Sequence, residues 1–257
     1  VNNMQCMNNY VKDYGGCLSI TSDTDEGVPS SIEVKNLIST NDVSLWRGGA
    51  VYIGRSSVLT MIDSTVQSAS GSGAIYASSA KVLLSQVLVL DSKCPIDGAA
   101  IMCVSSSLKL NGNSNISGTK GRGLKGNGCA LQVENVRFFN NTVVAFKATD
   151  MDINGGGISL VSESEATVIF STFELNTADG DGGGIMCNEC VNIDIANSTF
   201  FNNVAGRGGG LAIYQTPMYG SITSTTFTEN QARKGGGGGI YRVGEVALLL
   251  NNSVKFQ

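Results

Sequence analysis

Hydrophobic and polar residues alternate in short stretches along the chain, and glycine, asparagine and serine separate these stretches. Residues 191–196, with the sequence VNIDIA, show the alternation clearly. A period of two predicts a β-strand that buries one of its faces. No window shows a period of 3.6 residues with helix caps at its ends. We therefore expect an all-β protein built from short strands and tight turns.

A cluster of small residues followed by an aliphatic residue recurs along the whole chain. Its most regular form, GGG followed by Ile or Leu, occupies residues 155–158, 182–185, 208–211 and 237–240. More varied versions occupy residues 15–18, 48–51, 72–75, 98–101 and 128–131. The closing aliphatic residues are 24 to 33 residues apart. Self-similarity at this period is typical of solenoid proteins.

A second motif, F-x-x-N, lies between the glycine clusters. Its four clear copies begin at Phe138, Phe173, Phe200 and Phe227 and end at Asn141, Asn176, Asn203 and Asn230. Two weaker copies place Cys6 and Ile38 at the Phe position, with Asn9 and Asn41 at the Asn position.

The repeat length selects one architecture. A helix-free unit of 24 to 33 residues excludes helical repeats and is too short for a propeller blade, which needs about 40 residues. Two or three short strands with their turns fit one coil of a right-handed parallel β-helix. We expect residues 1–257 to form a single such solenoid of about nine coils. With one strand spacing per coil, the stack is roughly 40 Å long.

Stacking of equivalent positions explains the second motif. The Phe side chains should form an internal aromatic column with ring centroids about 5 Å apart. The Asn side chains should form an internal amide ladder, each bonded to the turn backbone of the neighbouring coils. We interpret both residue types as structural, which removes them from the catalytic candidates.

The two motifs together resemble the GGA[I/L/V] and F-x-x-N repeats of chlamydial polymorphic outer membrane proteins. More loosely, they resemble the pectin-lyase-like β-helix superfamily. The resemblance covers nearly the whole chain and is best over residues 138–241, although GGG replaces most GGA motifs and the first half fits less well. It implies a surface-exposed, adhesin-like domain.

The amino-acid composition excludes several kinds of active site and partner. Histidine is absent, which excludes Ser-His-Asp and Cys-His nucleophiles and histidine metal sites. A net charge of −4 argues against nucleic acid as a partner, and no apolar stretch is long enough to span a bilayer. Seven cysteines without a paired zinc motif favour an oxidising compartment, either extracellular or at the cell surface. The sequence does not determine which cysteines form disulfides. Because their number is odd, at least one thiol has no disulfide partner within the chain.

Two aspartate pairs, Asp150/Asp152 and Asp179/Asp181, are the best candidates for acid–base or calcium chemistry. Both pairs lie between motifs, where Asp is an ordinary turn residue. Glu163 and Glu165 fit a solvated loop, and exposed turns account for the basic residues Arg207, Arg233 and Lys234. We therefore expect no catalytic site, no metal site and no cofactor.

Sequons for N-glycosylation begin at Asn115, Asn140, Asn197 and Asn251. They are acceptors if the protein is secreted by a eukaryote. We expect Asn140 to be the most exposed, because it lies next to the ladder residue Asn141 at a corner.

The leading hypothesis is a non-catalytic structural or adhesive module, for example a subunit of a surface filament. The alternatives are a polysaccharide lyase or hydrolase, and a glycan-binding module without turnover. Residues 252–257 parallel residues 134–139, so the sequence stops inside an F-x-x-N motif. We expect a segment of a longer solenoid, whose partners are further coils or copies of itself.

Overall fold

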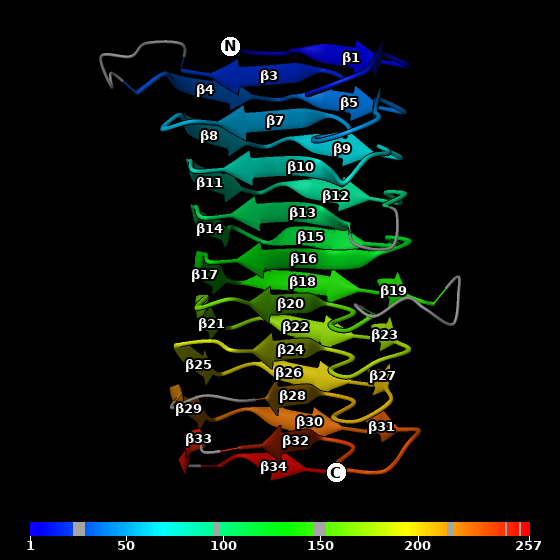
Figure 1. Cartoon of the computed structure of the whole chain (residues 1–257), viewed down its shortest axis with the longest axis vertical. Coiled ribbons are helices and arrows are strands. Elements are labelled where there is room, and N and C mark those ends of the chain that lie inside the picture. Colours follow the sequence, from blue (N-terminus) through cyan, green and yellow to red (C-terminus); the bar gives the residue numbers. More distant parts are fainter. Residues whose placement is uncertain (23–28, 95–97, 146–152, 215–217, 245, 252) are drawn as a thin grey trace.

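The computed structural model describes the chain except for residues 23–28, 95–97, 146–152, 215–217, 245 and 252. The described residues form strands, turns and bends (Figure 1). None of them belongs to a helix that would be long and apolar enough to cross a membrane. The all-β prediction is therefore confirmed.

Three long parallel sheets run the length of the molecule, and each coil contributes one strand to each sheet. Sheet I follows the glycine clusters and contains β3 (Leu18–Thr21), β7 (Val51–Gly54), β10 (Gly73–Ser78), β13 (Ala99–Val104), β16 (Arg122–Asn127), β20 (Ile158–Val161), β24 (Ile185–Asn188), β28 (Leu211–Tyr214) and β32 (Ile240–Val243). Sheet II contains β4 (Ser31–Lys35), β8 (Val58–Ile62), β11 (Lys81–Ser85), β14 (Ser107–Asn111), β17 (Ala130–Glu134), β21 (Glu165–Ile169), β25 (Asn192–Ala196), β29 (Met218–Thr223) and β33 (Val246–Asn251).

Sheet III carries the F-x-x-N motif. Its strands are β1 (Gln5–Met7), β5 (Ile38–Thr40), β9 (Thr65–Gln67), β12 (Leu88–Leu90), β15 (Ser114–Ser117), β18 (Val136–Phe139), β22 (Thr172–Glu174), β26 (Thr199–Phe201), β30 (Thr226–Thr228) and β34 (Lys255–Phe256). Two small sheets follow it in the coil, one of β19 (Thr142–Val143), β23 (Thr177–Ala178), β27 (Val204–Ala205) and β31 (Gln231–Ala232), and one of β2 (Tyr10–Val11) and β6 (Val43–Ser44).

The core lies inside the tube formed by the three sheets. On β25, Ile193 and Ile195 are buried, as their alternation predicts, whereas Val191 lies just before the strand and is 45% exposed. In most strands of sheet I, two apolar residues on either side of an outward-facing residue point into the core, as Leu18 and Ile20 do on β3. Most strands of sheets II and III thus bury one face each, whereas outward residues of sheet I such as Tyr52 and Met186 are almost buried as well. No single strand is stable without its neighbours.

Left-handed backbone conformations mark the corners between sheets. Non-glycine residues with positive φ recur at one position of successive coils, for example Asn36, Asp63 and Gln86 between sheets II and III. Asparagine tolerates this conformation better than most residues, because its short side chain bonds to nearby backbone. The abundance of Asn and Ser therefore follows from the number of corners.

One repeat assignment is wrong. The cluster at residues 128–131 does not occupy the sheet I position, because Leu131 pairs with Leu108 and Ala166 in sheet II. Its place in sheet I is taken by Leu124, which pairs with Ile101 and Ile158. The preceding Arg122 stands where other coils have glycine or alanine, which hides this copy of the cluster from a search for small residues.

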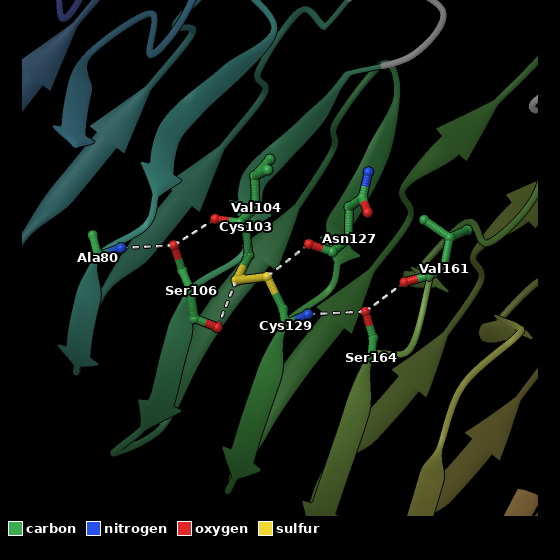
Figure 2. Close-up of a disulfide and its surroundings, with 8 residues drawn as sticks. All are labelled: Ala80, Cys103, Val104, Ser106, Asn127, Cys129, Val161 and Ser164. Carbon is green, nitrogen blue, oxygen red and sulfur yellow. Dashed lines mark hydrogen bonds between the residues drawn. A yellow bond between two sulfur atoms is a disulfide. The ribbon is translucent and has the colours of Figure 1, made fainter. Parts of the chain in front are cut away.

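Three disulfides form among the seven cysteines, and the pairs are Cys6–Cys17, Cys103–Cys129 and Cys187–Cys190. The Cys103–Cys129 bond joins two consecutive coils (Figure 2). Cys94 is left as a free, buried thiol.

Serine residues line the same corner as this disulfide. The Ser106 hydroxyl accepts a hydrogen bond from the Ala80 amide (3.0 Å) and donates to the Val104 carbonyl (2.7 Å). One coil beyond the disulfide, Ser164 accepts from the Cys129 amide (3.1 Å) in the same way (Figure 2). These hydroxyls satisfy buried backbone donors that the turn leaves without a sheet partner.

Candidate functional site

The Phe residues of the second motif form one internal column. Consecutive rings from Phe138 through Phe173 and Phe200 to Phe227 have centroids 5.0, 4.7 and 4.6 Å apart and are nearly parallel. Phe256 continues the column beyond Phe227 at 5.4 Å. Four of the five rings are buried, so this column belongs to the core and not to a binding surface.

The Asn residues form a ladder beside the rings. Asn176 shows its pattern: the Nδ2 group donates to Oδ1 of Asn203 (3.0 Å) and to the Phe138 carbonyl (3.0 Å). The Asn176 amide also donates to Oδ1 of Asn203 (3.1 Å). The same bonds repeat along Asn141, Asn176, Asn203 and Asn230. Each side-chain amide within the ladder thus bonds to the backbone of the preceding coil and to the side-chain amide of the next coil.

The ladder assignment of Asn41 is wrong by one residue. Strand pairing aligns Cys6 with Ser39, not with Ile38. The ladder position of that coil is consequently Asp42, whose Oδ1 accepts bonds from the Asn9 amide and Nδ2, both at 2.8 Å. Asn41 instead has φ of 56° at an exposed corner. Asparagine and aspartate both suit the ladder, so the adjacent pair is ambiguous in sequence.

A polar cluster on the outer side of sheet I is the second feature. The buried carboxylate of Asp181 receives two bonds from Arg207, from Nη2 (2.9 Å) and Nε (3.2 Å). The Tyr214 hydroxyl donates to the same carboxylate, and the Asn154 side chain accepts from the Asp181 amide. Arg207 also reaches the hydroxyl of Tyr241 (3.3 Å). This cluster spans adjacent coils.

The pKa shifts in the cluster keep Arg207 charged and the Tyr214 hydroxyl protonated. Hydrogen bonds to Asp181 and Tyr241 raise the pKa of Arg207 above its already high value. Burial, followed by the bond to Asp181, raises the pKa of Tyr214. Both carboxylate oxygens of Asp181 are occupied, so the group is poorly placed to take a proton from a bound molecule.

A smaller ion pair lies next to this cluster. Arg233 contacts Asp179 (3.4 Å), whose other oxygen accepts from the Ala145 amide (2.9 Å). Lys234 donates to the backbone carbonyl of Asp179 (3.2 Å). The structure therefore gathers Asp179, Asp181, Arg207, Arg233 and Lys234 in one neighbourhood, which the interpretation as separate turn residues missed. Tyr214 and Tyr241 carry no sequence signal that would have added them.

The remaining acidic candidates do not join a site. Glu163 and Glu165 are exposed at the start of β21. Asp150 and Asp152 lie outside the described residues. Within the described part of the chain, one group of three potential metal ligands lies close together, namely Cys6, Cys17 and Asp42.

This group is already bonded. The two sulfur atoms form a disulfide, and a disulfide sulfur is not the thiolate that binds metals. The Oδ2 atom of Asp42 accepts a bond from the Ser39 hydroxyl (2.6 Å), in addition to the Asn9 bonds.

The four sequons differ in their accessibility. Asn140 and Asn197 are exposed at left-handed corners, and Asn251 is exposed at the end of β33. Asn115 is half-buried within β15, where its side chain donates to Ser117 Oγ (3.4 Å).

Comparison with known proteins adds one finding. The family model for a right-handed β-helix region matches residues 51–254. Neither the curated proteins nor the solved structures contain a match to this chain.

Proposed function

Because this chain belongs to the right-handed β-helix family, we propose that it is a non-catalytic structural or adhesive module of an extracellular or cell-surface protein. The observation that carries the proposal is the pair of Phe and Asn columns in the C-terminal half. Their side chains stack on one another and bond to the turns. The most regular residues of the sequence thus build a rod and face no ligand.

The state of the carboxylates supports a non-catalytic role. Asp181 and Asp179 each have an arginine partner, and Asp181 has a tyrosine partner too. A general base needs a free lone pair directed at the substrate proton. These groups stabilise the outer surface of neighbouring coils instead.

The three disulfides support an oxidising location outside the cytosol. In such a setting the exposed sequons at Asn140, Asn197 and Asn251 would be accessible to glycosylation in a eukaryote. We propose copies of the same chain, or further coils, as its assembly partners, because parallel strand edges pair readily with more strands.

Polysaccharide cleavage is the second candidate function, and one observation favours it. A carboxylate, an arginine and two tyrosines meet on adjacent coils of sheet I, at Asp181, Arg207, Tyr214 and Tyr241. An enzyme of this architecture would need a cluster of this kind on one outer face.

Incubation of the protein with a panel of acidic and neutral polysaccharides, with and without Ca²⁺, separates the two functions. We expect no new reducing ends and no unsaturated sugars. Cleavage by the native protein that is abolished in Asp181→Asn, but retained in the ion-pair control Asp179→Asn, would establish the enzymatic alternative.

A further inference from the structure

One corner between sheets II and III is longer than the corners above and below it. In sheet II, Leu110 pairs with Leu84 of the preceding coil. In sheet III, Asn115 pairs with Leu88 of that same preceding coil. The corner at residues 111–114 thus has four residues where the preceding coil has three, and the following coil also has three. This corner therefore contains a one-residue insertion.

The insertion leaves the backbone amide of Gly112 without an acceptor. In a regular corner the residue that follows the sheet II strand donates its amide to the next coil, as Gln86 does to the Asn111 carbonyl (3.2 Å). In the longer corner Asn113 makes this bond instead, to the Asn135 carbonyl (3.0 Å). Gly112 has a left-handed φ of 72°, and its amide donates no hydrogen bond within the described part of the chain.

The side chain before this glycine also lacks a partner. Oδ1 of Asn111 is buried and accepts no hydrogen bond from the residues that the structure describes. The backbone carbonyl of Asn111, in contrast, accepts bonds from the Gln86 amide (3.2 Å) and the Ser114 hydroxyl (2.6 Å). The backbone of Asn111 is therefore anchored, while no bond restrains its carboxamide oxygen or the amide that follows.

Asparagine precedes glycine at three places in the sequence, and the other two glycines are bonded. The Gly128 amide donates to the Val161 carbonyl (3.2 Å), and the Gly155 amide donates to the Asp181 carbonyl (3.0 Å). Oδ1 of Asn154 also accepts a bond from the Asp181 amide (2.7 Å). Both of these glycine amides must leave an inter-coil bond before they can react.

We propose that Asn111 is a site of spontaneous deamidation, at which the folded rod acquires a carboxylate as it ages. The Gly112 nitrogen attacks Cγ of Asn111 and loses its proton, and the new C–N bond closes a succinimide ring. The bond between Cγ and Nδ2 breaks, and ammonia leaves. Water then opens the ring at either carbonyl, which produces aspartate or isoaspartate. Glycine favours the attack, because no Cβ shields its nitrogen.

The new carboxylate lies next to another acidic residue. Leu110 pairs with Val133, so the residues that follow them, Asn111 and Glu134, are neighbours in sheet II. Like charges on adjacent strands repel each other, and isoaspartate also adds an atom to the backbone. Deamidation therefore weakens the pairing of the two coils at this corner.

The test is peptide mapping by mass spectrometry after the protein has been incubated in a mildly alkaline buffer. Isoaspartate is measured in parallel by enzymatic methylation. In the folded protein we expect Asn111 to lose its amide about tenfold faster than Asn127 or Asn154, the ratio that one hydrogen bond of ordinary strength implies. In denaturant the three sites should react at comparable rates, since each precedes a glycine.

Two matched variants assign the isoaspartate signal. Asn111→Gln keeps the carboxamide but lengthens the side chain, so ring closure is slower and most of the signal should disappear. Asn127→Gln makes the same change next to a bonded glycine amide and should leave the signal unchanged. Unchanged circular dichroism shows that each variant is folded.

Three results would overturn the proposal. The first is an equal rate of deamidation at all three sites of the folded protein. The second is an intact Asn111 in the folded protein under conditions that deamidate it in denaturant. The third is an isoaspartate signal that persists in Asn111→Gln. None of these results depends on polysaccharide cleavage, so the proposed function is tested separately.

Discussion

The two halves of the solenoid follow the same path with different side chains inside. In the C-terminal half, one internal column of sheet III consists of phenylalanine. In the N-terminal half, strand pairing places residues of four different types in the same column, namely Cys6, Ser39, Val66, Val89 and Ile116. The strands pair in parallel in both halves.

The ladder position shows the same contrast. After Asp42 it is occupied by Ala69, Ser92 and Thr119 before the first Asn of the regular ladder. The hydroxyls of Ser92 and Thr119 are buried and form no hydrogen bond. The coil geometry therefore does not require the ladder, since strand alternation and left-handed corners suffice. The ladder adds stability and regularity to a path that the chain already follows.

The aromatic column provides the largest expected difference between the halves. Phe200→Ala should lower the free energy of unfolding by about 3–5 kcal/mol, because it removes a buried ring and two stacking contacts. The equivalent change in the N-terminal half, Val89→Ala, should cost about 2 kcal/mol, because it removes less apolar surface. Chemical denaturation of both variants measures the difference. Equal losses would contradict a larger contribution from the aromatic column.

The amide ladder should give the next largest effect. Asn203→Ala leaves the buried donors of Asn176 without their acceptor, at a cost of ~1–3 kcal/mol. Ser92→Ala removes a hydroxyl that has no partner, so we expect a change within about 0.5 kcal/mol. Denaturation curves of the two variants test this pair directly. A loss at Ser92 as large as that at Asn203 would contradict the contrast between the halves.

Extending the ladder into the N-terminal half should be mildly stabilising. The Thr119 amide already donates to Oδ1 of Asn141 (3.2 Å), as the Asn residues of the ladder do. Thr119→Asn adds an amide of similar volume that can donate to the same oxygen and replaces the unbonded hydroxyl. We expect a gain of about 1 kcal/mol in the free energy of unfolding. The matched change in a regular coil, Asn176→Thr, should be destabilising.

The smallest effect concerns the free thiol near Ser92. Burial raises the pKa of the Cys94 thiol to about 12, so the reactive thiolate is scarce at about pH 8. A thiol reagent should not label the folded protein, and denaturant without reductant should expose one reactive thiol. Rapid labelling of the native protein would reveal local opening of this coil.

Sequence periodicity predicts the fold because its signals repeat in every coil. Strand alternation, glycine clusters and F-x-x-N each occur many times, so single errors such as Asn41 shift one position and leave the architecture intact. Arg122 interrupts the small-residue pattern. The motif search therefore assigned the sheet I strand of that coil to residues 128–131, although Leu124 occupies the position.

Surface clusters escape such reasoning for a physical reason. Asp181 lies 26 residues before Arg207 and 33 residues before Tyr214. Residues that far apart in the sequence can be recognised as spatial neighbours only when the length of each coil is known. The cysteine pairs have the same difficulty, since Cys103 and Cys129 meet only through the stacking of two coils.

The Cys103–Cys129 bond has a mechanical consequence. When the two ends of a solenoid are pulled apart, its coils peel away one after another and each adds its length to the extended chain. The disulfide closes a loop with a sequence separation of 26 residues, which would otherwise extend by about 90 Å. With the bond intact, the residues of this loop cannot extend when the protein is pulled. The extended chain is therefore shorter and stiffer at the boundary between the irregular and the regular half of the solenoid.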